Sequence, residues 1–132
     1  MKGTYIIVIF LKKHIQISIG ALGLISFKKG YYLYIGSAMG DFGSSTLINR
    51  VKRHISPPEN KKIHWHIDYF LNNQETSIVQ LNLIPSRQKL ECILAEELIS
   101  QSDGYIKKFG SSDCNCLSHL IYHKESFFKD KK

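Results

Sequence analysis

The segment from Thr4 to Leu11, TYIIVIFL, places the strongest constraint on the fold. It is rich in β-branched and aromatic residues and has almost no polar interruption. A strand with this composition is apolar on both faces, which is typical of strands that are buried on both sides. The segment therefore predicts a central strand in a sheet.

Three further strands are expected in the first third of the chain. Residues 14–20, HIQISIG, alternate apolar and polar side chains, which indicates a strand with one solvent-facing side. Residues 24–37 predict two strands that turn at Lys28-Lys29-Gly30. In the second of these, alternation places Tyr32 and Tyr34 on one face and Tyr31 on the other. These segments together predict a β-meander.

Two helices are predicted by apolar periodicity. Residues 46–55, TLINRVKRHI, follow a glycine-rich stretch, with Ser44 or Ser45 as the expected cap, and precede a Pro-Pro pair. Residues 86–101 carry apolar side chains at helical spacing, with Ser86 as the expected cap.

The remaining segments predict shorter elements. Residues 61–73, KKIHWHIDYFLNN, indicate a loop that leads into a short helix, and residues 76–84 return to strand character. The tail predicts a loop followed by a short edge strand at 119–123. With 132 residues and neither internal repeat nor linker, we expect one domain over 1–132. Its expected class is α/β (α+β), with a small, mostly antiparallel sheet and helices packed on it.

Charge and cysteine usage limit the function. Lys and Arg number 18 against 11 Asp and Glu, a formal charge of +7, which favours a polyanionic partner such as nucleic acid. No apolar run is long enough to cross a bilayer and the N-terminus lacks a signal-peptide cleavage site, so we expect a cytoplasmic protein. Cys92, Cys114 and Cys116 make an odd count, so reduced thiols or metal ligation are expected rather than a disulfide framework.

Two triplets and a basic helix occur in a specific order. Gly3-Thr4-Tyr5 opens the first strand, Tyr34-Ile35-Gly36 closes a later one, and the helix 46–55 follows. This order resembles the GIY-YIG nuclease superfamily. The resemblance implies a small antiparallel sheet flanked by helices, and hydrolysis of phosphodiester bonds with one divalent metal, Mg²⁺ or Mn²⁺. It also implies a nucleic-acid substrate, DNA rather than RNA.

Carried over by position, the resemblance implies five catalytic residues. Tyr5 and Tyr34 would face each other near the scissile phosphate, with Tyr5 as the base and Tyr34 orienting water or phosphate. Arg50 and His54 would share one helix face through their i,i+4 spacing, and Arg50 would hold phosphate oxygens. Glu91 would bind the metal.

Other side chains would assist this centre. Ser37, Lys52 and Arg53 are the expected phosphate-binding neighbours. The alternative explanation for each residue taken singly is structural, because tyrosines commonly fill strands and basic helices commonly present a solvated face. The interval between the two triplets exceeds the superfamily's usual spacing, which implies an inserted hairpin over roughly residues 14–27.

The departures resemble an uncharacterised branch of the superfamily. Its small domains carry HWHID and GSSDCxCxSHL signatures, found here at 64–68 and 110–120, and also occur fused to DNA-repair glycosylases. A repair-protein partner is therefore expected. His119 belongs to the second of these signatures.

The signatures admit three interpretations. Cys114, Cys116 and His119 could bind zinc, although the Cys-x-Cys spacing is tighter than in most structural zinc sites. His64, Asp68 and Asp113 could instead form hydrogen bonds that fasten the loops around the cleft. His66 or Asp113 could help to activate water.

Three functions remain open at this point: a metal-dependent endonuclease, a non-catalytic nucleic-acid-binding accessory domain, and a zinc-stabilised interaction module.

Overall fold

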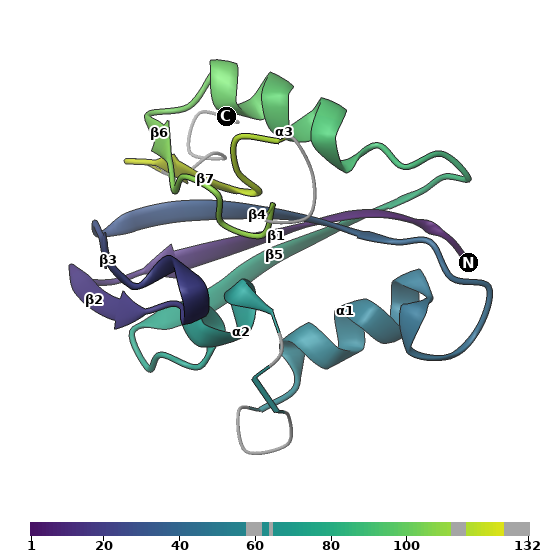
Figure 1. Ribbon diagram of the computed structural model, residues 1–132, viewed down its shortest axis with the longest axis horizontal. Coiled ribbons are helices and arrows are strands. Elements are labelled where there is room, and N and C mark those ends of the chain that lie inside the picture. The colour runs from purple at the N-terminus through teal and green to yellow at the C-terminus, as the bar shows by residue number, and fades with distance from the viewer. Residues whose placement is uncertain (58–61, 64, 112–115, 126–132) are drawn as a thin grey trace.

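The structure is a computed structural model, and it describes residues 1–57, 62–63, 65–111 and 116–125. Within this part of the chain the fold is α+β, with a five-stranded antiparallel sheet in the order β5-β1-β4-β7-β6 and three α-helices (Figure 1). The predicted class and the mostly antiparallel sheet are confirmed. The strands of this sheet are β1 (Gly3–Leu11), β4 (Gly30–Ala38), β5 (Thr76–Pro85), β6 (Gly104–Tyr105) and β7 (Leu120–His123).

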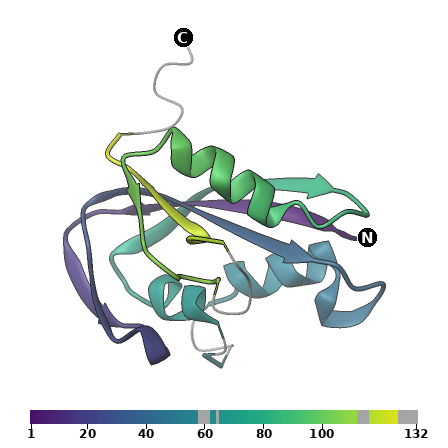
Figure 2. The ribbon, with the colours of Figure 1, turned by 45° about the horizontal axis from the view of Figure 1, so that its top comes forward.

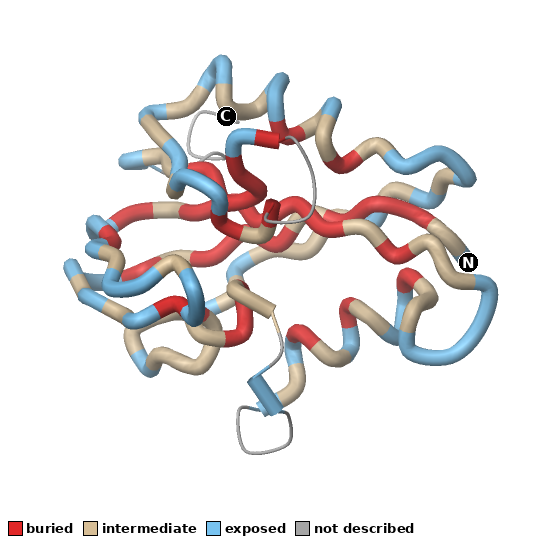
Figure 3. The backbone as a smooth tube through the Cα atoms, in the orientation of Figure 1, coloured by how far each residue is buried: buried red, intermediate tan, exposed pale blue. Residues whose placement is uncertain are grey.

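Strand β1 is central, as its apolar sequence predicts. It pairs antiparallel with β4 on one side, from Gly3 opposite Ala38 to Leu11 opposite Gly30, and with β5 on the other. Every residue of β1 is buried or half-buried, and buried backbone follows the central strands in Figure 3. This pairing fixes which β1 side chains face each covering layer.

The segment between β1 and β4 forms a separate hairpin rather than part of a meander. Among the described strands, β2 (Ile15–Ser18) and β3 (Leu24–Phe27) pair only with each other, across the 3-10 turn η1 (Gly20–Leu22). The predicted insertion over residues 14–27 is therefore confirmed, and the predicted continuous meander is wrong. The hairpin joins the main core because Phe27 is fully buried, with its ring centroid 4.7 Å from that of Phe70.

Helices cover the two faces of the sheet. α1 (Leu47–Ile55) and α2 (His66–Leu71) lie on one face, and α3 (Glu91–Ser100) lies across the other (Figures 1 and 2). Two apolar clusters match these layers, one containing Leu47 and Phe70 and the other containing Ala95. Alternation along β4 separates its tyrosines as predicted, because Tyr32 and Tyr34 join the first cluster and Tyr31 packs against the second.

Two predictions about where the helices begin are wrong. α1 is preceded by Thr46, and Ser44 and Ser45 lie in the 3-10 turn η2 (Gly43–Ser45) rather than capping the helix. α3 begins at Glu91, five residues after Ser86, because the Ser86 hydroxyl instead accepts the Gln88 N–H at 3.0 Å in a local turn.

The predicted edge position of the strand at 119–123 is also wrong. Strand β7 lies inside the sheet, between β4 and the two-residue edge strand β6. Its sequence resembles that of an edge strand because only four residues pair. Among the described residues, no helix combines the length and apolar character that a membrane span requires.

Candidate active site

A cavity of about 220 Å³ lies beside the C-terminal half of β4, between α1 and the start of α3. Four of the five predicted catalytic residues line it, and the fifth, His54, lies directly behind Tyr5. The lining residues are Tyr5, Tyr34, Gly36, Ser37, Arg50, Trp65, Lys89, Glu91, Gly110 and His119. Residues that lie far apart in the sequence thus converge on one place.

The pairing of β1 with β4 positions Tyr5. Tyr5 lies directly opposite Gly36, and its ring packs over that glycine so closely that a Cβ there would lie 2.7 Å from Tyr5 Cε1 and nearer still to Cζ. Gly36 therefore leaves room for an aromatic ring. The hydroxyl of Tyr5 is hydrogen-bonded to His54 Nε2 at 2.7 Å, and both side chains are buried.

Burial controls the acidity of Tyr5. Desolvation raises the pKa of Tyr5 well above its usual value, the nearby Tyr34 adds to the rise, and the Arg50 guanidinium opposes it only in part. The phenol is thus protonated at neutral pH. Tyr5 acting alone would be a poor base, and its contact with His54 supplies the group that could take its proton.

Tyr34 lies next to Tyr5 on the same face of the sheet. Their ring centroids are 6.4 Å apart and the rings are tilted by 49°. Gly110 approaches Tyr34 from the loop before β7, where its φ of +71° favours glycine and a Cβ would lie 3.2 Å from Tyr34 Cε1.

Arg50 reaches the cavity from the middle of α1. Its Nη1 donates to the carbonyl oxygen of Ser37 at 3.3 Å, and its guanidinium lies 4.9 Å from the centre of the Trp65 ring. Within the described residues, Arg50 forms no ion pair with a carboxylate. Its Nε also donates to the carbonyl oxygen of Ser44 at 3.4 Å. The guanidinium is therefore oriented by two backbone carbonyls and an aromatic ring, with donors left for a ligand.

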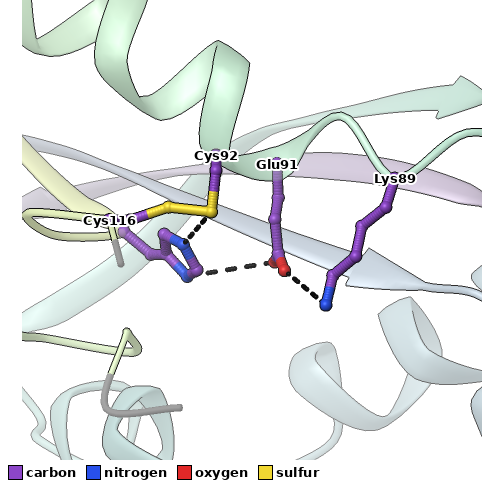
Figure 4. The surroundings of a disulfide bond; sticks show 5 residues. Lys89, Glu91, Cys92 and Cys116 are labelled. Carbon is purple, nitrogen blue, oxygen red and sulfur yellow. Dashed lines mark hydrogen bonds and ion pairs between the residues drawn. A yellow bond between two sulfur atoms is a disulfide. The ribbon is translucent and has the colours of Figure 1, made fainter. Parts of the chain in front are cut away.

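Glu91 reaches the same cavity from the opposite layer. β7 pairs with β4 only as far as Tyr34, so the last residues of β4 are not covered by β7, and the first turn of α3 comes close there. Figure 4 shows the Glu91 side chain extending away from α3. Its two oxygens lie 3.2 Å from Lys89 Nζ and 3.9 Å from His119 Nδ1.

The structure places Arg53 and Lys52 outside the cavity lining. Arg53 donates to both oxygens of Asp68 at 3.0 Å, and its guanidinium lies 4.3 Å from the centre of the Trp65 ring. Asp68 is fully buried and also accepts the Trp65 N–H at 2.9 Å, which caps α2. Arg53 and Asp68 thus fasten α1 to α2. Lys52 is exposed, whereas Ser37 does line the cavity.

The remaining signature residues divide into three groups. His66 does not line the cavity; its Nδ1 accepts the Gly110 N–H at 2.9 Å, and burial lowers the pKa of its imidazole. His119 lines the cavity. His64 and Asp113 lie outside the described residues, so their hydrogen bonds stay predictions. Asp68 is bound by Arg53.

The expectation of reduced cysteines is corrected by the structure. Cys92, in the first turn of α3, forms a disulfide with Cys116, 24 residues away, with Cα atoms 5.7 Å apart (Figure 4). Cys114 lies outside the described residues.

Sequence reasoning gave no site role to four lining residues, namely Gly36, Trp65, Lys89 and Gly110. Trp65 had a signal, since it is the chain's single tryptophan and stands inside HWHID; both arginines of α1 lie over its ring. Lys89 stands two residues before Glu91, which gave a weaker signal. Gly110 opens the second signature, and only the folded chain shows that Tyr34 packs against it.

Fold and site together define a class, namely α+β domains with a small antiparallel sheet and a polar cavity formed by two tyrosines, an arginine and a glutamate. The chain belongs to the family described as domain of unknown function DUF123, whose model matches residues 4–131. No curated protein and no solved structure matches the chain.

Proposed function

We propose that this protein is a metal-dependent endonuclease of GIY-YIG type, which hydrolyses phosphodiester bonds in nucleic acid, with DNA as the substrate. One observation carries the proposal: Tyr5, Tyr34, Arg50 and Glu91 line a single cavity although they come from four different elements. The formal charge of +7 adds support, because a phosphate backbone binds a basic protein.

The cavity suits a hydrated divalent ion. Glu91 offers a hard carboxylate oxygen, and the remaining space leaves room for the water ligands that Mg²⁺ retains. When bound, Mg²⁺ or Mn²⁺ would neutralise charge that develops on the phosphate and the leaving oxygen.

The chain's own residues would perform the other tasks. Arg50 would hold a non-bridging phosphate oxygen through its planar guanidinium, since its orientation is already set by Ser37 and Trp65. Tyr5 would accept a proton from the attacking water while passing its own to His54, because its raised pKa disfavours a standing phenolate. Tyr34 would orient the water or the phosphate. Phosphate contacts by Lys52 and Arg53 stay predictions from the sequence.

A plasmid-nicking assay with Mg²⁺ or Mn²⁺ tests the proposal. We expect Arg50→Ala to lose about 100–1,000-fold in rate, as when one charge-stabilising donor is removed, and Glu91→Ala to lose at least as much. Glu96→Ala is the matched control, because Glu96 is exposed on the same helix, and it should cleave like the wild type. Full activity in both Arg50→Ala and Glu91→Ala would refute the assignment.

One contact favours a second candidate, a domain that binds nucleic acid without cleaving it. Lys89 Nζ lies 3.2 Å from Glu91 Oε1, so the carboxylate already has a cationic partner where a metal would bind. This candidate predicts binding that weakens steeply with salt, and no cleavage with any divalent metal. If the wild type cleaves nucleic acid and Lys89→Ala raises the cleavage rate, this second candidate is excluded.

A further inference from the structure

A cluster of sulfur and imidazole ligands adjoins the cavity on the side of α3. It consists of Cys92 in the first turn of α3, Cys116 in the segment before β7, and His119 directly before β7. One ligand atom from each lies within 4.8 Å of the others. The sequence suggested zinc ligation by Cys114, Cys116 and His119; among the described residues, the fold adds Cys92 from another element to Cys116 and His119.

These ligand types and separations match zinc chemistry. Zn²⁺ binds thiolates and imidazoles at about 2.0–2.3 Å, and tetrahedral geometry then places ligand atoms roughly 3.3–3.8 Å apart. The two cysteines have Cα atoms 5.7 Å apart and direct their sulfurs toward each other, so modest side-chain rotations would open a metal position between them. The third ligand is already beside it, because His119 Nε2 lies 3.9 Å from Cys92 Sγ.

The other ring nitrogen of His119 supplies the second half of the argument. Its Nδ1 faces Glu91 Oε2 at 3.9 Å, so the imidazole lies between a sulfur and a carboxylate. Zinc-binding histidines commonly direct their second nitrogen to a carboxylate, which fixes the tautomer and makes the ring a better ligand. The order of the groups, from carboxylate through imidazole to the sulfur ligands, is therefore that of a carboxylate-histidine-zinc unit.

We propose that Cys92, Cys116 and His119 form a Zn²⁺ site when the disulfide is reduced, with a fourth position open to water. A dithiol reductant would break the S–S bond, transfer two electrons and two protons to the cysteines, and itself become a disulfide. Zn²⁺ would then displace the two thiol protons. The site differs from a Mg²⁺ site at Glu91, because thiolates select soft metals and oxygen ligands select hard ones.

The proposal has a structural consequence for Glu91. In the oxidised state the disulfide ties the first turn of α3 to the segment before β7. In the reduced state Zn²⁺ would join the same two segments through the same residues. The first turn of α3, which begins with Glu91, would thus be held in either redox state.

Metal binding to the full chain tests the site. The protein is purified without added zinc, reduced with dithiothreitol, freed of reductant without air, and titrated with Zn²⁺ and Co²⁺. In the reduced protein we expect about one bound ion per chain and the absorption spectrum of tetrahedral, thiolate-bound Co²⁺. In the oxidised protein we expect no bound ion and no such spectrum. Cys92→Ser and Cys116→Ser should lose this spectrum. Cys114→Ser, the matched control, should retain it.

Three results would overturn the proposal: no zinc bound by the reduced wild type, a normal spectrum in Cys92→Ser, or an equal loss in Cys114→Ser. If the Cys92 and Cys116 variants fail to fold, His119→Gln decides, because it retains the disulfide during purification and should lose the spectrum after reduction.

A further variant tests the link to the carboxylate. Glu91→Gln should retain one zinc per chain but bind it about 10–100-fold more weakly. Unchanged affinity would show that Glu91 does not support His119. None of these readouts requires nuclease activity, so the zinc site and the proposed function can fail separately.

Discussion

Gly36→Ala tests whether the register between β1 and β4 builds the candidate active site. A Cβ at Gly36 would lie 2.7 Å from Tyr5 Cε1, whereas ordinary contact begins at 3.4 Å. The obstacle is a buried ring anchored by a hydrogen bond to His54, not the end of a flexible side chain. The Tyr5 ring must therefore move by roughly 1 Å, which would separate its hydroxyl from His54.

The cost follows from three contributions. Overpacking of a buried site costs about 1–3 kcal/mol, loss of the Tyr5 hydrogen bond costs about 1 kcal/mol, and removing a glycine from the unfolded chain gives back about 0.4–1 kcal/mol. We expect Gly36→Ala to lower the free energy of unfolding by about 1–3.5 kcal/mol. For a chain of this length that lowers Tm by about 4–14 °C.

Urea and thermal unfolding measure the effect, with Gly104→Ala as the matched control. A Cβ at Gly104 would meet nothing within 4 Å, so this variant should be at least as stable as the wild type. Combining Gly36→Ala with Tyr5→Ala should remove most of the cost, because the ring that obstructs the new methyl group is gone. Equal stability of Gly36→Ala and Gly104→Ala would refute the reasoning, as would an unchanged cost in the Tyr5→Ala background.

Three further predictions concern charge and covalent structure. Burial raises the pKa of Tyr5 in the folded state, so the unfolded chain loses this proton first as pH rises above about 10. The free energy of unfolding should therefore decline above that pH, and less steeply in Tyr5→Phe. Equal declines with pH in the two proteins, measured by denaturant titrations, would contradict this. Asp68→Asn should lower the free energy of unfolding in urea by about 2–4 kcal/mol, because it removes a buried charge that Arg53 contacts twice. Glu75→Gln should cost no more than about 1 kcal/mol, because Glu75 is half-buried and its partners Lys12 and Lys13 are exposed and 3.8–3.9 Å away. Reducing the disulfide in metal-free protein should lower the free energy of unfolding by about 3.5 kcal/mol, given its separation of 24 residues, and an unchanged denaturation midpoint would contradict the chain-entropy argument.

The sheet could be predicted where a pattern extends over several residues. The apolar run of β1 identified the central strand, and alternation separated Tyr31 from Tyr32 and Tyr34. Helix starts were less predictable because a serine has several local partners. Ser86 bonds within its own turn instead of capping a helix.

The convergence of Tyr5, Tyr34, Arg50 and Glu91 was predicted only through a resemblance. Composition and spacing explain each of them equally well as packing or as solvated charge. The sequence did not predict the contact of Arg53 with Asp68 or the disulfide between Cys92 and Cys116, which both join distant elements. Arg53 has a basic-helix context that suggests a phosphate ligand, but the fold places buried Asp68 beside it.

The incomplete pairing of β4 explains how Glu91, from the layer of α3, meets Arg50, from the layer of α1. A central strand with partners along both sides would separate α1 from α3 completely. The last residue pair of β4 with β7 is Tyr34 with Leu120, and one more backbone bond joins the Ile35 N–H to the His119 carbonyl at 2.9 Å. Gly36 then follows with no side chain to fill the space beside Tyr5. Glu91 enters at this point because α3 begins late, after the turn that Ser86 forms. The features that weaken the sheet locally, a short β7 and a glycine in β4, are therefore the ones that create the cavity.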